Sequence, residues 1–145
     1  MILCVDTDVL VHWVMDGAPL HEPCRRLLGR EIREKGNQLG ITPQVLHELI
    51  HICTDPRRFE NHLSMDQAIM WSRSLWDGKD VVRLLPSAAV FHRTLELLKN
   101  LRLGRKRILD TALAATLEAA DVKRLATLNA RDFEVFPFIE TVVPA

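Results

Sequence analysis

Ile2-Leu3-Cys4-Val5-Asp6-Thr7-Asp8 opens the chain and sets the kind of sheet to expect. Four apolar residues in succession are typical of a strand that is buried on both faces of a parallel sheet. Asp6 ends the apolar run, and Thr7 or Asp8 is a suitable cap for a short helix directly after it. Because ligands bind at the carboxyl ends of strands in open α/β sheets, Asp6 stands at a functional position. The structural alternative is that Asp6 only caps the next helix.

The remainder of the chain alternates short apolar runs with segments of helical periodicity. We predict further strands at 39–41, 81–85, 124–128 and 141–143, and helices at 8–13, 23–35, 43–53, 64–76, 86–100 and 108–120. The helix at 23–35 is expected to be amphipathic, with a solvated and mostly basic outer face. Strands that alternate with helices predict an α/β domain with a mainly parallel central sheet.

Composition supports one globular domain over residues 1–145. The chain has 19 basic and 19 acidic residues, and 48% of its residues are hydrophobic. No run of about 18 apolar residues occurs and the first apolar run is too short for a leader, so we expect neither a membrane span nor a secretory signal. Cys4, Cys24 and Cys53 are widely spaced, which favours free thiols and a cytoplasmic location.

Four acidic residues occupy positions where a purely structural role is not the best explanation. Asp6 follows a buried strand, and Glu48 lies at the edge of an apolar helical stripe. Asp110 is the only charge between Arg107 and Glu118, in a helix so apolar that we expect it to be buried nearly all round. Asp132 follows the strand at 124–128. Capping, solvation or an ordinary turn remains the alternative for each acid taken singly.

Taken together, the four acids predict a metal site. In a parallel sheet the end of the first strand, the start of the helix at 108–120 and the turn after 124–128 share one edge, toward which Glu48 is also brought. Two carboxylates about 5 Å apart repel by about 3 kcal/mol at an effective dielectric constant of about 20. Such a cluster therefore needs a divalent cation, and oxygen ligands favour Mg²⁺ or Mn²⁺ over zinc. This is the equipment of phosphodiester hydrolysis.

The chain resembles the PIN-domain nucleases, and most of all the VapC toxins of VapBC toxin–antitoxin pairs. The resemblance rests on four motifs in the family's order, which are Val5-Asp6-Thr7-Asp8-Val9-Leu10, Val45-Leu46-His47-Glu48-Leu49, Asp110-Thr111-Ala112-Leu113-Ala114-Ala115 and Thr127-Leu128-Asn129-Ala130-Arg131-Asp132-Phe133. It implies a parallel sheet of about five strands with helices on both faces. It also implies a Mg²⁺-dependent endoribonuclease that is silenced by an antitoxin, with a homodimer expected.

The resemblance also implies roles for individual residues. Asp6, Glu48 and Asp110 correspond to the metal-binding acids, and Asp132 to the fourth. Two positions depart from the family pattern: Asp8 stands where Asn or Ser is frequent, and Asn129 where Asp is frequent, so either Asn129 or Asp132 faces the metal. The predicted contacts to RNA lie mostly in the basic connector before Asp110, and the full set is Arg105, Lys106, Arg107, Asn129 and Thr7.

Three other functions remain as alternatives. His47-Glu48-Leu49-Ile50-His51 matches H-E-x-x-H, the signature of zinc proteases, but no third ligand stands at a familiar spacing. Asp6-x-Asp8 after an apolar strand is found in aspartate-based phosphohydrolases, whose later motifs are missing here. The third alternative is a PIN-like binding module without catalytic activity.

Overall fold

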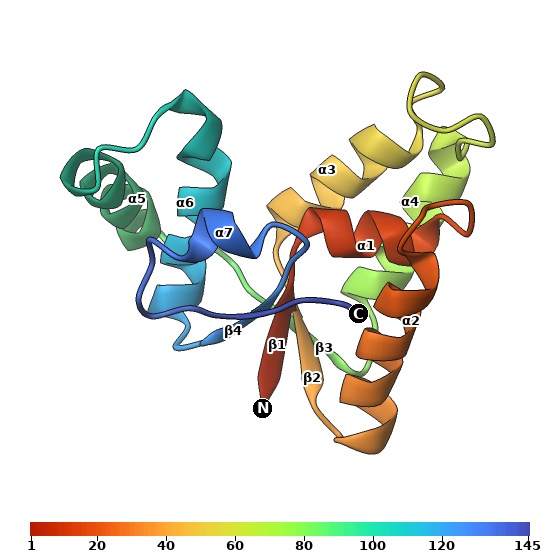
Figure 1. Cartoon of the computed structure of the whole chain (residues 1–145), viewed down its shortest axis with the longest axis horizontal. Coiled ribbons are helices and arrows are strands. Elements are labelled where there is room, and N and C mark those ends of the chain that lie inside the picture. The colour runs from red at the N-terminus through yellow and green to blue at the C-terminus, as the bar shows by residue number, and fades with distance from the viewer.

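A single five-stranded sheet organises the computed structural model, which describes all 145 residues. The strands are β1 (Ile2–Val5), β2 (Gln38–Ile41), β3 (Val81–Arg83), β4 (Arg124–Ala126) and β5 (Glu140–Val142). Their order in space is β3-β2-β1-β4-β5, and every neighbouring pair is parallel. The parallel α/β architecture is confirmed, with β1 at the centre of the sheet (Figure 1).

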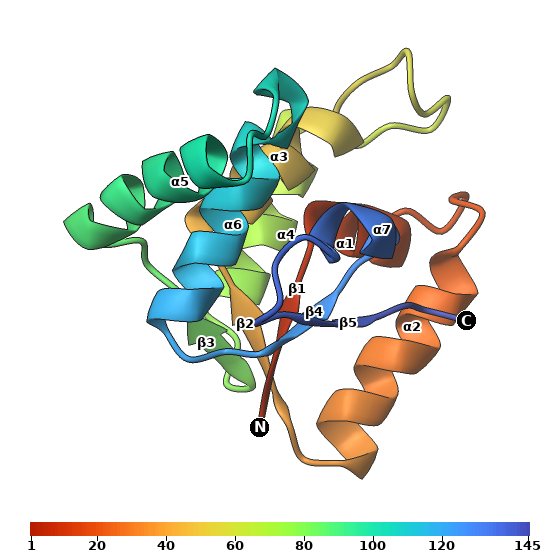
Figure 2. The same ribbon diagram turned by 60° about the vertical axis from the view of Figure 1, so that its left-hand side comes forward.

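Helices cover both faces of the sheet. They are α1 (Thr7–Val14), α2 (His21–Gly29), α3 (Pro43–Cys53), α4 (Met65–Trp76), α5 (Ala88–Asn100), α6 (Ile108–Ala119) and the short α7 (Ala130–Phe133). The first four helices lie on one side of the sheet, and α5 and α6 lie on the other (Figures 1 and 2). No helix combines the length and the apolar character that a bilayer-spanning segment needs.

Local sequence signals place most helix starts correctly. The side chain of Thr42 accepts a hydrogen bond from the backbone of Val45, with Pro43 in the first turn of α3. Ser64 and Gln67 form a complete capping box at the start of α4. These side chains satisfy backbone N–H groups that the first helical turn leaves without partners, which fixes where each helix begins.

The core forms around β1, as its uninterrupted apolar sequence predicts. Leu3, Cys4 and Val5 are fully buried, and so are Leu125 and Ala126 on the neighbouring strand β4. Helices packed on both faces exclude water from this strand, so no polar alternation is seen in it. All three cysteines are free and buried. Because β1 ends at the centre of the sheet, Asp6 is delivered to the middle of the carboxyl edge.

Two expectations about helices are wrong in part. The helix predicted at 23–35 is α2 followed by a π-helical turn, Arg30–Glu34, and Glu31 on that turn is 1% exposed and not solvated. In α6 the later turns are buried as expected, but Ile108 and Leu109 in the first turn are exposed. An ion-pair partner from β4 explains the burial of Glu31.

Candidate active site

A cavity of about 620 Å³ lies at the carboxyl end of β1 and collects three of the four predicted acids. Asp6, Glu48 and Asp110 all line it, and Asp8 joins them. Asn129 and Thr7, two of the expected substrate contacts, also line the cavity. Asp132 does not. The remaining lining residues are Val11, His12, Ile52, Arg58 and Phe59.

Asp6 caps α1 and lines the cavity at the same time. Its Oδ1 accepts a hydrogen bond from the backbone N–H of Thr7 at 2.8 Å, and its Oδ2 accepts one from the Thr127 hydroxyl at 2.9 Å. The pKa of Asp6 is raised to about 6, mainly by burial and also by the nearby charges of Asp8 and Glu48, against the lowering effect of these hydrogen bonds. The capping role is therefore real, and it orients a carboxylate that is unfavourably buried with other acids.

Asp110 sits in the first turn of α6 and faces the same acids. Its pKa is raised to about 6, mainly by burial and also by the charges of Asp6, Asp132 and Glu48. Arg107 opposes this shift, since its Nε lies 3.7 Å from Oδ2 of Asp110. Glu48 projects from α3, where Gln44 donates a hydrogen bond to its Oε1 at 3.1 Å. Three separate elements thus bring carboxylates together whose charges repel.

Asp8 and Asn129, the two departures from the family pattern, are in direct contact. The Asn129 amide donates to Oδ2 of Asp8 at 2.8 Å, and the backbone N–H of Leu128 donates to the same oxygen at 3.2 Å. Burial raises the pKa of Asp8 while these donors lower it. Asp8 therefore ties the turn after β4 to the start of α1 and holds Asn129 at the cavity.

Asp132 and the basic connector lie at the margin of the cavity. Asp132 is close enough to raise the pKa of Asp110, but its side chain makes no contact with the cavity. Arg107 donates a hydrogen bond from Nη2 to the backbone carbonyl of Asp132, so its guanidinium is bound to the protein from two sides. Arg105 and Lys106 are exposed in the 3₁₀ turn that precedes α6.

The residues of this cavity fit a hard divalent cation by their chemistry. No three acidic, histidine or cysteine side chains are arranged closely enough to hold an ion as they stand. The donors that line the cavity are nevertheless carboxylate oxygens, the ligands that Mg²⁺ and Mn²⁺ prefer. The raised pKa values of Asp6 and Asp110 show that the charges lack compensation, which a bound cation would provide.

Sequence reasoning did not identify His12, Arg58 and Phe59 as lining residues. Arg58 and Phe59 belong to the polar segment after α3, where nothing in the residue pattern indicates which way the chain turns. One signal was available for this segment: Ile52 follows Glu48 by one helical turn, so the chain leaving α3 passes the same edge.

The geometry separates the two halves of the H-E-x-x-H motif. Glu48 lines the acidic cavity, whereas the exposed His47 lines a different hollow, together with Ile50, Ile69 and Arg73. His51 is exposed and lines neither. The arrangement therefore does not favour a shared zinc site on α3.

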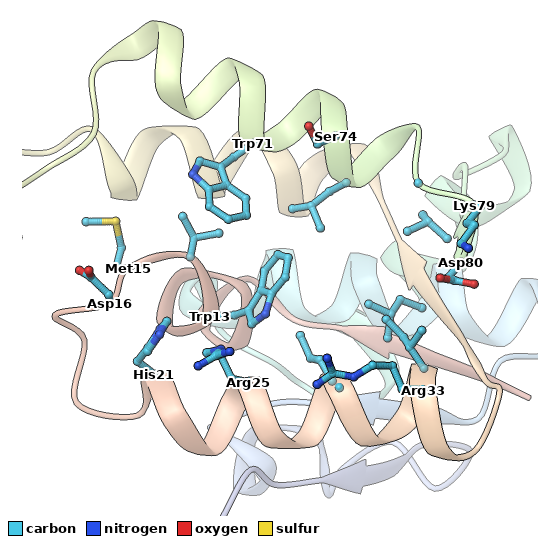
Figure 3. Close-up of a pocket in the computed structure, with 18 of the residues that line it drawn as sticks. Trp13, Met15, Asp16, His21, Arg25, Arg33, Trp71, Ser74, Lys79 and Asp80 are labelled. Carbon is cyan, nitrogen blue, oxygen red and sulfur yellow. The ribbon is translucent and has the colours of Figure 1, made fainter.

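A second and larger cavity, about 880 Å³, lies between α1, α2 and α4 and contains none of the predicted site acids (Figure 3). Trp13 and Trp71 meet across it edge to face, with ring centroids 5.4 Å apart. Half of its twenty lining residues are hydrophobic. Arg25 from α2 and Arg33 from the π-helical turn that follows it stand along one side. The cavity therefore combines an apolar surface around the two tryptophans with charged residues at its margin.

The fold and the site together define an α/β domain of the parallel, three-layer type with a carboxylate-lined cavity at the strand ends. The chain belongs to the PIN domain family, whose family model matches residues 3–139. No curated protein sequence matches the chain.

Three solved structures share the fold at low sequence identity. VapC20 of Mycobacterium tuberculosis, described as a toxin that cleaves the sarcin–ricin loop, has a TM-score of 0.65 at 16% identity, over 86% of this chain and 87% of that one. A toxin–antitoxin complex from Klebsiella pneumoniae has a TM-score of 0.63 at 16% identity, over 99% of this chain and 98% of that one. VapBC2 of Rickettsia felis, bound to a DNA fragment from its promoter, has a TM-score of 0.65 at 19% identity, over 99% of this chain and 98% of that one.

Proposed function

We propose that this protein is a metal-dependent endoribonuclease and the toxin of a type II toxin–antitoxin pair. The observation that carries the proposal is the meeting of Asp6, Glu48 and Asp110, from three elements, in one cavity at the carboxyl edge of the sheet. The raised pKa values of Asp6 and Asp110 support it, because buried and mutually repelling acids mark functional sites. Membership of the PIN family and the VapC fold support the same activity.

Asp6, Glu48 and Asp110 would hold Mg²⁺, for which Mn²⁺ is the natural substitute, and Asp132 would act from the margin through its charge. A divalent ion bound there supplies a water of lowered pKa and polarises the scissile phosphate. The RNA products would then carry a 5′-phosphate and a 3′-hydroxyl.

The protein's own contribution is to hold these carboxylates in place. Thr127 and the N–H of Thr7 fix both oxygens of Asp6, and Gln44 fixes Glu48. Arg107 partly offsets the charge of Asp110 and lowers its pKa, which favours the ionised form of that acid at neutral pH. Fixed donors of this kind orient reacting groups before the substrate arrives, so little reorganisation is left for the reaction itself.

The proposed partner is an antitoxin that covers the second cavity. The similar structures from K. pneumoniae and R. felis are of toxin–antitoxin assemblies, and the apolar surface around Trp13 and Trp71 offers a site for such a protein. We expect co-expression of a small neighbouring gene product to abolish RNA cleavage. Trp71→Glu should then keep cleavage but lose inhibition.

A homodimer is also proposed, with the exposed apolar side chains of α5 at its interface. Phe91 is 64% exposed and Leu95 is 48% exposed, one helical turn apart on the same face.

The three free thiols are consistent with a reducing cytoplasm as the place of action.

Incubation of the purified protein with single-stranded RNA, with and without Mg²⁺ or Mn²⁺, tests the nuclease activity. The wild type should cleave only with a divalent ion, and Asp6→Asn and Asp110→Asn should each lower the rate by about 100-fold or more. Asp66→Asn, an exposed acid in the first turn of α4, is the matched control and should retain full activity. Sequencing of RNA ends after brief induction identifies the target. Cleavage that survives both substitutions, or that needs no metal, would contradict the proposal.

A further inference from the structure

Two arginines stand near the acidic cavity, and only one of them is free. Arg107 is engaged with Asp110 and with the backbone carbonyl of Asp132. Arg58 lines the cavity, is exposed, and its guanidinium makes no hydrogen bond or ion pair within the protein. The free cation that lines the cavity therefore comes from the segment after α3, whereas Arg105 and Lys106 of the basic connector are exposed and do not line it.

The position of Arg58 is fixed by a hydrogen-bonded turn. The backbone carbonyl of Asp55 accepts hydrogen bonds from the N–H groups of Arg58, at 3.1 Å, and Phe59, at 3.2 Å. The Asp55 side chain accepts another from the N–H of Arg57 at 2.9 Å. Further along, the N–H of Leu63 donates to the carbonyl of Cys53 at 2.8 Å, which ties the segment back to the end of α3. These hydrogen bonds hold the backbone around Arg58 in a defined loop, and Arg58 and Phe59 of this loop line the cavity.

His12 lines the cavity in a defined tautomer. Its Nδ1 accepts a hydrogen bond from the backbone N–H of Leu20 at 3.1 Å. An accepting Nδ1 places the proton of the neutral ring on Nε2. Nε2 has no partner within the protein, so it remains available as a donor to a ligand at the cavity.

We propose that Arg58 and His12, which line the same cavity as the carboxylates, form a phosphate-binding wall that holds a single-stranded RNA nucleotide next to the scissile bond. RNA brings negative charge to a cavity that is already acidic, so binding needs cations and donors facing the acids. The Arg58 guanidinium would bind phosphate oxygens, with the Nε2–H of His12 as a second donor. Phe59 contributes an apolar surface beside them. The inference rests on the proposed ribonuclease function.

The wall can be tested by RNA binding in the absence of cleavage. The probe is a short fluorescein-labelled single-stranded RNA of mixed sequence, and its anisotropy is followed in EDTA over a series of salt concentrations. Arg58→Ala should weaken binding about tenfold, the effect of losing one charge-assisted contact. It should also lower the slope of log affinity against log salt by about 0.7, because one phosphate contact on a single strand is lost.

The neighbouring Arg57 supplies the matched control. Its side chain is 90% exposed in the same turn and does not line the cavity, so Arg57→Ala should leave both the affinity and the salt slope unchanged. For His12, Asn keeps an acceptor near the position of Nδ1, whereas Gln keeps a donor near that of Nε2. We therefore expect His12→Gln to bind RNA and His12→Asn to bind several-fold more weakly, with thermal unfolding showing that each variant is folded.

The outcomes separate this inference from the nuclease proposal. A wild type that cleaves RNA while Arg58→Ala binds it with unchanged affinity and slope would overturn the phosphate-binding wall alone. An equal loss of RNA affinity in Arg57→Ala and Arg58→Ala would also overturn it, because diffuse surface charge would then explain binding. In cleavage assays with a divalent ion, Arg58→Ala should raise KM more than it lowers kcat. A wild type that binds RNA through Arg58 but cleaves none would overturn the nuclease proposal instead.

Discussion

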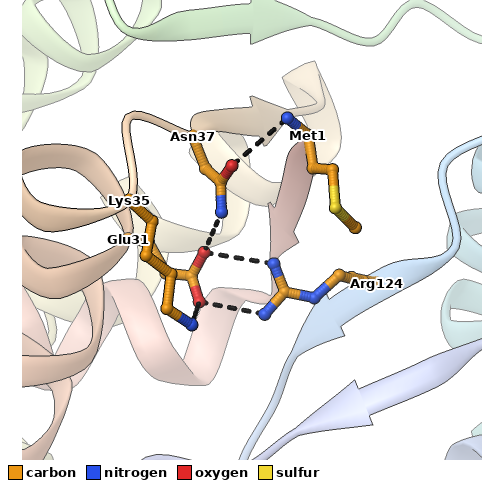
Figure 4. Close-up of polar contacts among 5 residues, drawn as sticks. All are labelled: Met1, Glu31, Lys35, Asn37 and Arg124. Carbon is orange, nitrogen blue, oxygen red and sulfur yellow. Dashed lines mark hydrogen bonds and ion pairs between the residues drawn. The ribbon is translucent and has the colours of Figure 1, made fainter.

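Glu31 and Arg124, 93 residues apart in the sequence, form a two-pronged ion pair between the π-helical turn and β4 (Figure 4). Nη2 of Arg124 lies 2.9 Å from Oε1 of Glu31, and Nη1 lies 3.1 Å from Oε2. The Glu31 side chain is 1% exposed and that of Arg124 is 14% exposed. Lys35 and Asn37 donate to the same carboxylate, and Asn37 also accepts from the N-terminal amine. The network joins the first layer of helices to the central strands.

Removal of one partner of this pair should destabilise the fold strongly. We expect Glu31→Ala to lower the free energy of unfolding by about 3–5 kcal/mol, because it leaves the guanidinium of Arg124 buried without its carboxylate. Urea unfolding followed by circular dichroism measures the change. Glu34 is an exposed acid of the same turn, so Glu34→Ala is the control and should leave the free energy of unfolding nearly unchanged. A double variant, Glu31→Leu with Arg124→Met, should recover part of the loss; an additive loss would refute the ion-pair explanation.

The same pair predicts how stability depends on acid. Hydrogen bonds from Arg124 lower the pKa of Glu31 from 4.5 to about 2. A carboxyl whose pKa is lowered by folding stabilises the protein fully above its ordinary pKa, and this contribution is lost as the pH falls toward the folded value. The wild type should therefore lose about 3 kcal/mol relative to Glu31→Gln between pH 4.5 and pH 2. Parallel unfolding curves for the two proteins across that window would contradict this assignment.

When no metal is present, ionisation of Asp110 should destabilise the fold, whereas ionisation of Glu31 stabilises it. Its pKa is raised to about 6, so its ionisation costs stability as the pH rises from 3.8 through 6. Because the side chain is 29% exposed, solvent reduces the effect, and we expect Asp110→Asn to be more stable than the wild type by about 1–2 kcal/mol at pH 7.5 in EDTA. Added Mg²⁺ should stabilise the wild type more than the variant. Thermal unfolding measures both, and a destabilised Asp110→Asn in EDTA would rule out the repulsion.

The contact between Asp8 and Asn129 predicts a compensating exchange. Asn129→Asp should place two carboxylates against each other and cost about 2–4 kcal/mol near neutral pH. Combining it with Asp8→Asn restores one acid and one amide, so the double variant should regain most of the stability in thermal unfolding. Failure of the second substitution to rescue the first would show that the pair does not interact through charge.

The proposed dimer makes a prediction about α5. Phe91→Asp and Leu95→Asp should each shift the protein from dimer to monomer in light scattering without a large loss of stability, since both side chains are exposed in the isolated chain. Val143→Asp, at an exposed apolar residue after β5, is the control and should leave the dimer intact. A wild-type protein that is monomeric at every concentration would contradict the proposed dimer interface.

Much of the fold follows from local sequence signals. The apolar run before Asp6, the Thr42-Pro43 cap and the Ser64 cap depend only on neighbouring residues, and all three mark real element boundaries. The order of the acids along the chain also carried the family resemblance, which the PIN family match confirms. The predicted roles of Asp6, Glu48 and Asp110 stay predictions, but their placement in one cavity follows from a parallel sheet.

The pairing of charges between distant segments depended on the tertiary structure. Periodicity alone places Glu31 on a solvated face, and only the approach of β4 shows that Arg124 buries it. In the same way, residue type made Arg107 the expected RNA contact, whereas folding engages Arg107 and leaves Arg58 free at the cavity. Helix and strand preferences arise within a few residues, so the sequence carries them directly. Burial and charge pairing arise where segments far apart in the chain meet, so they appear only in the folded protein.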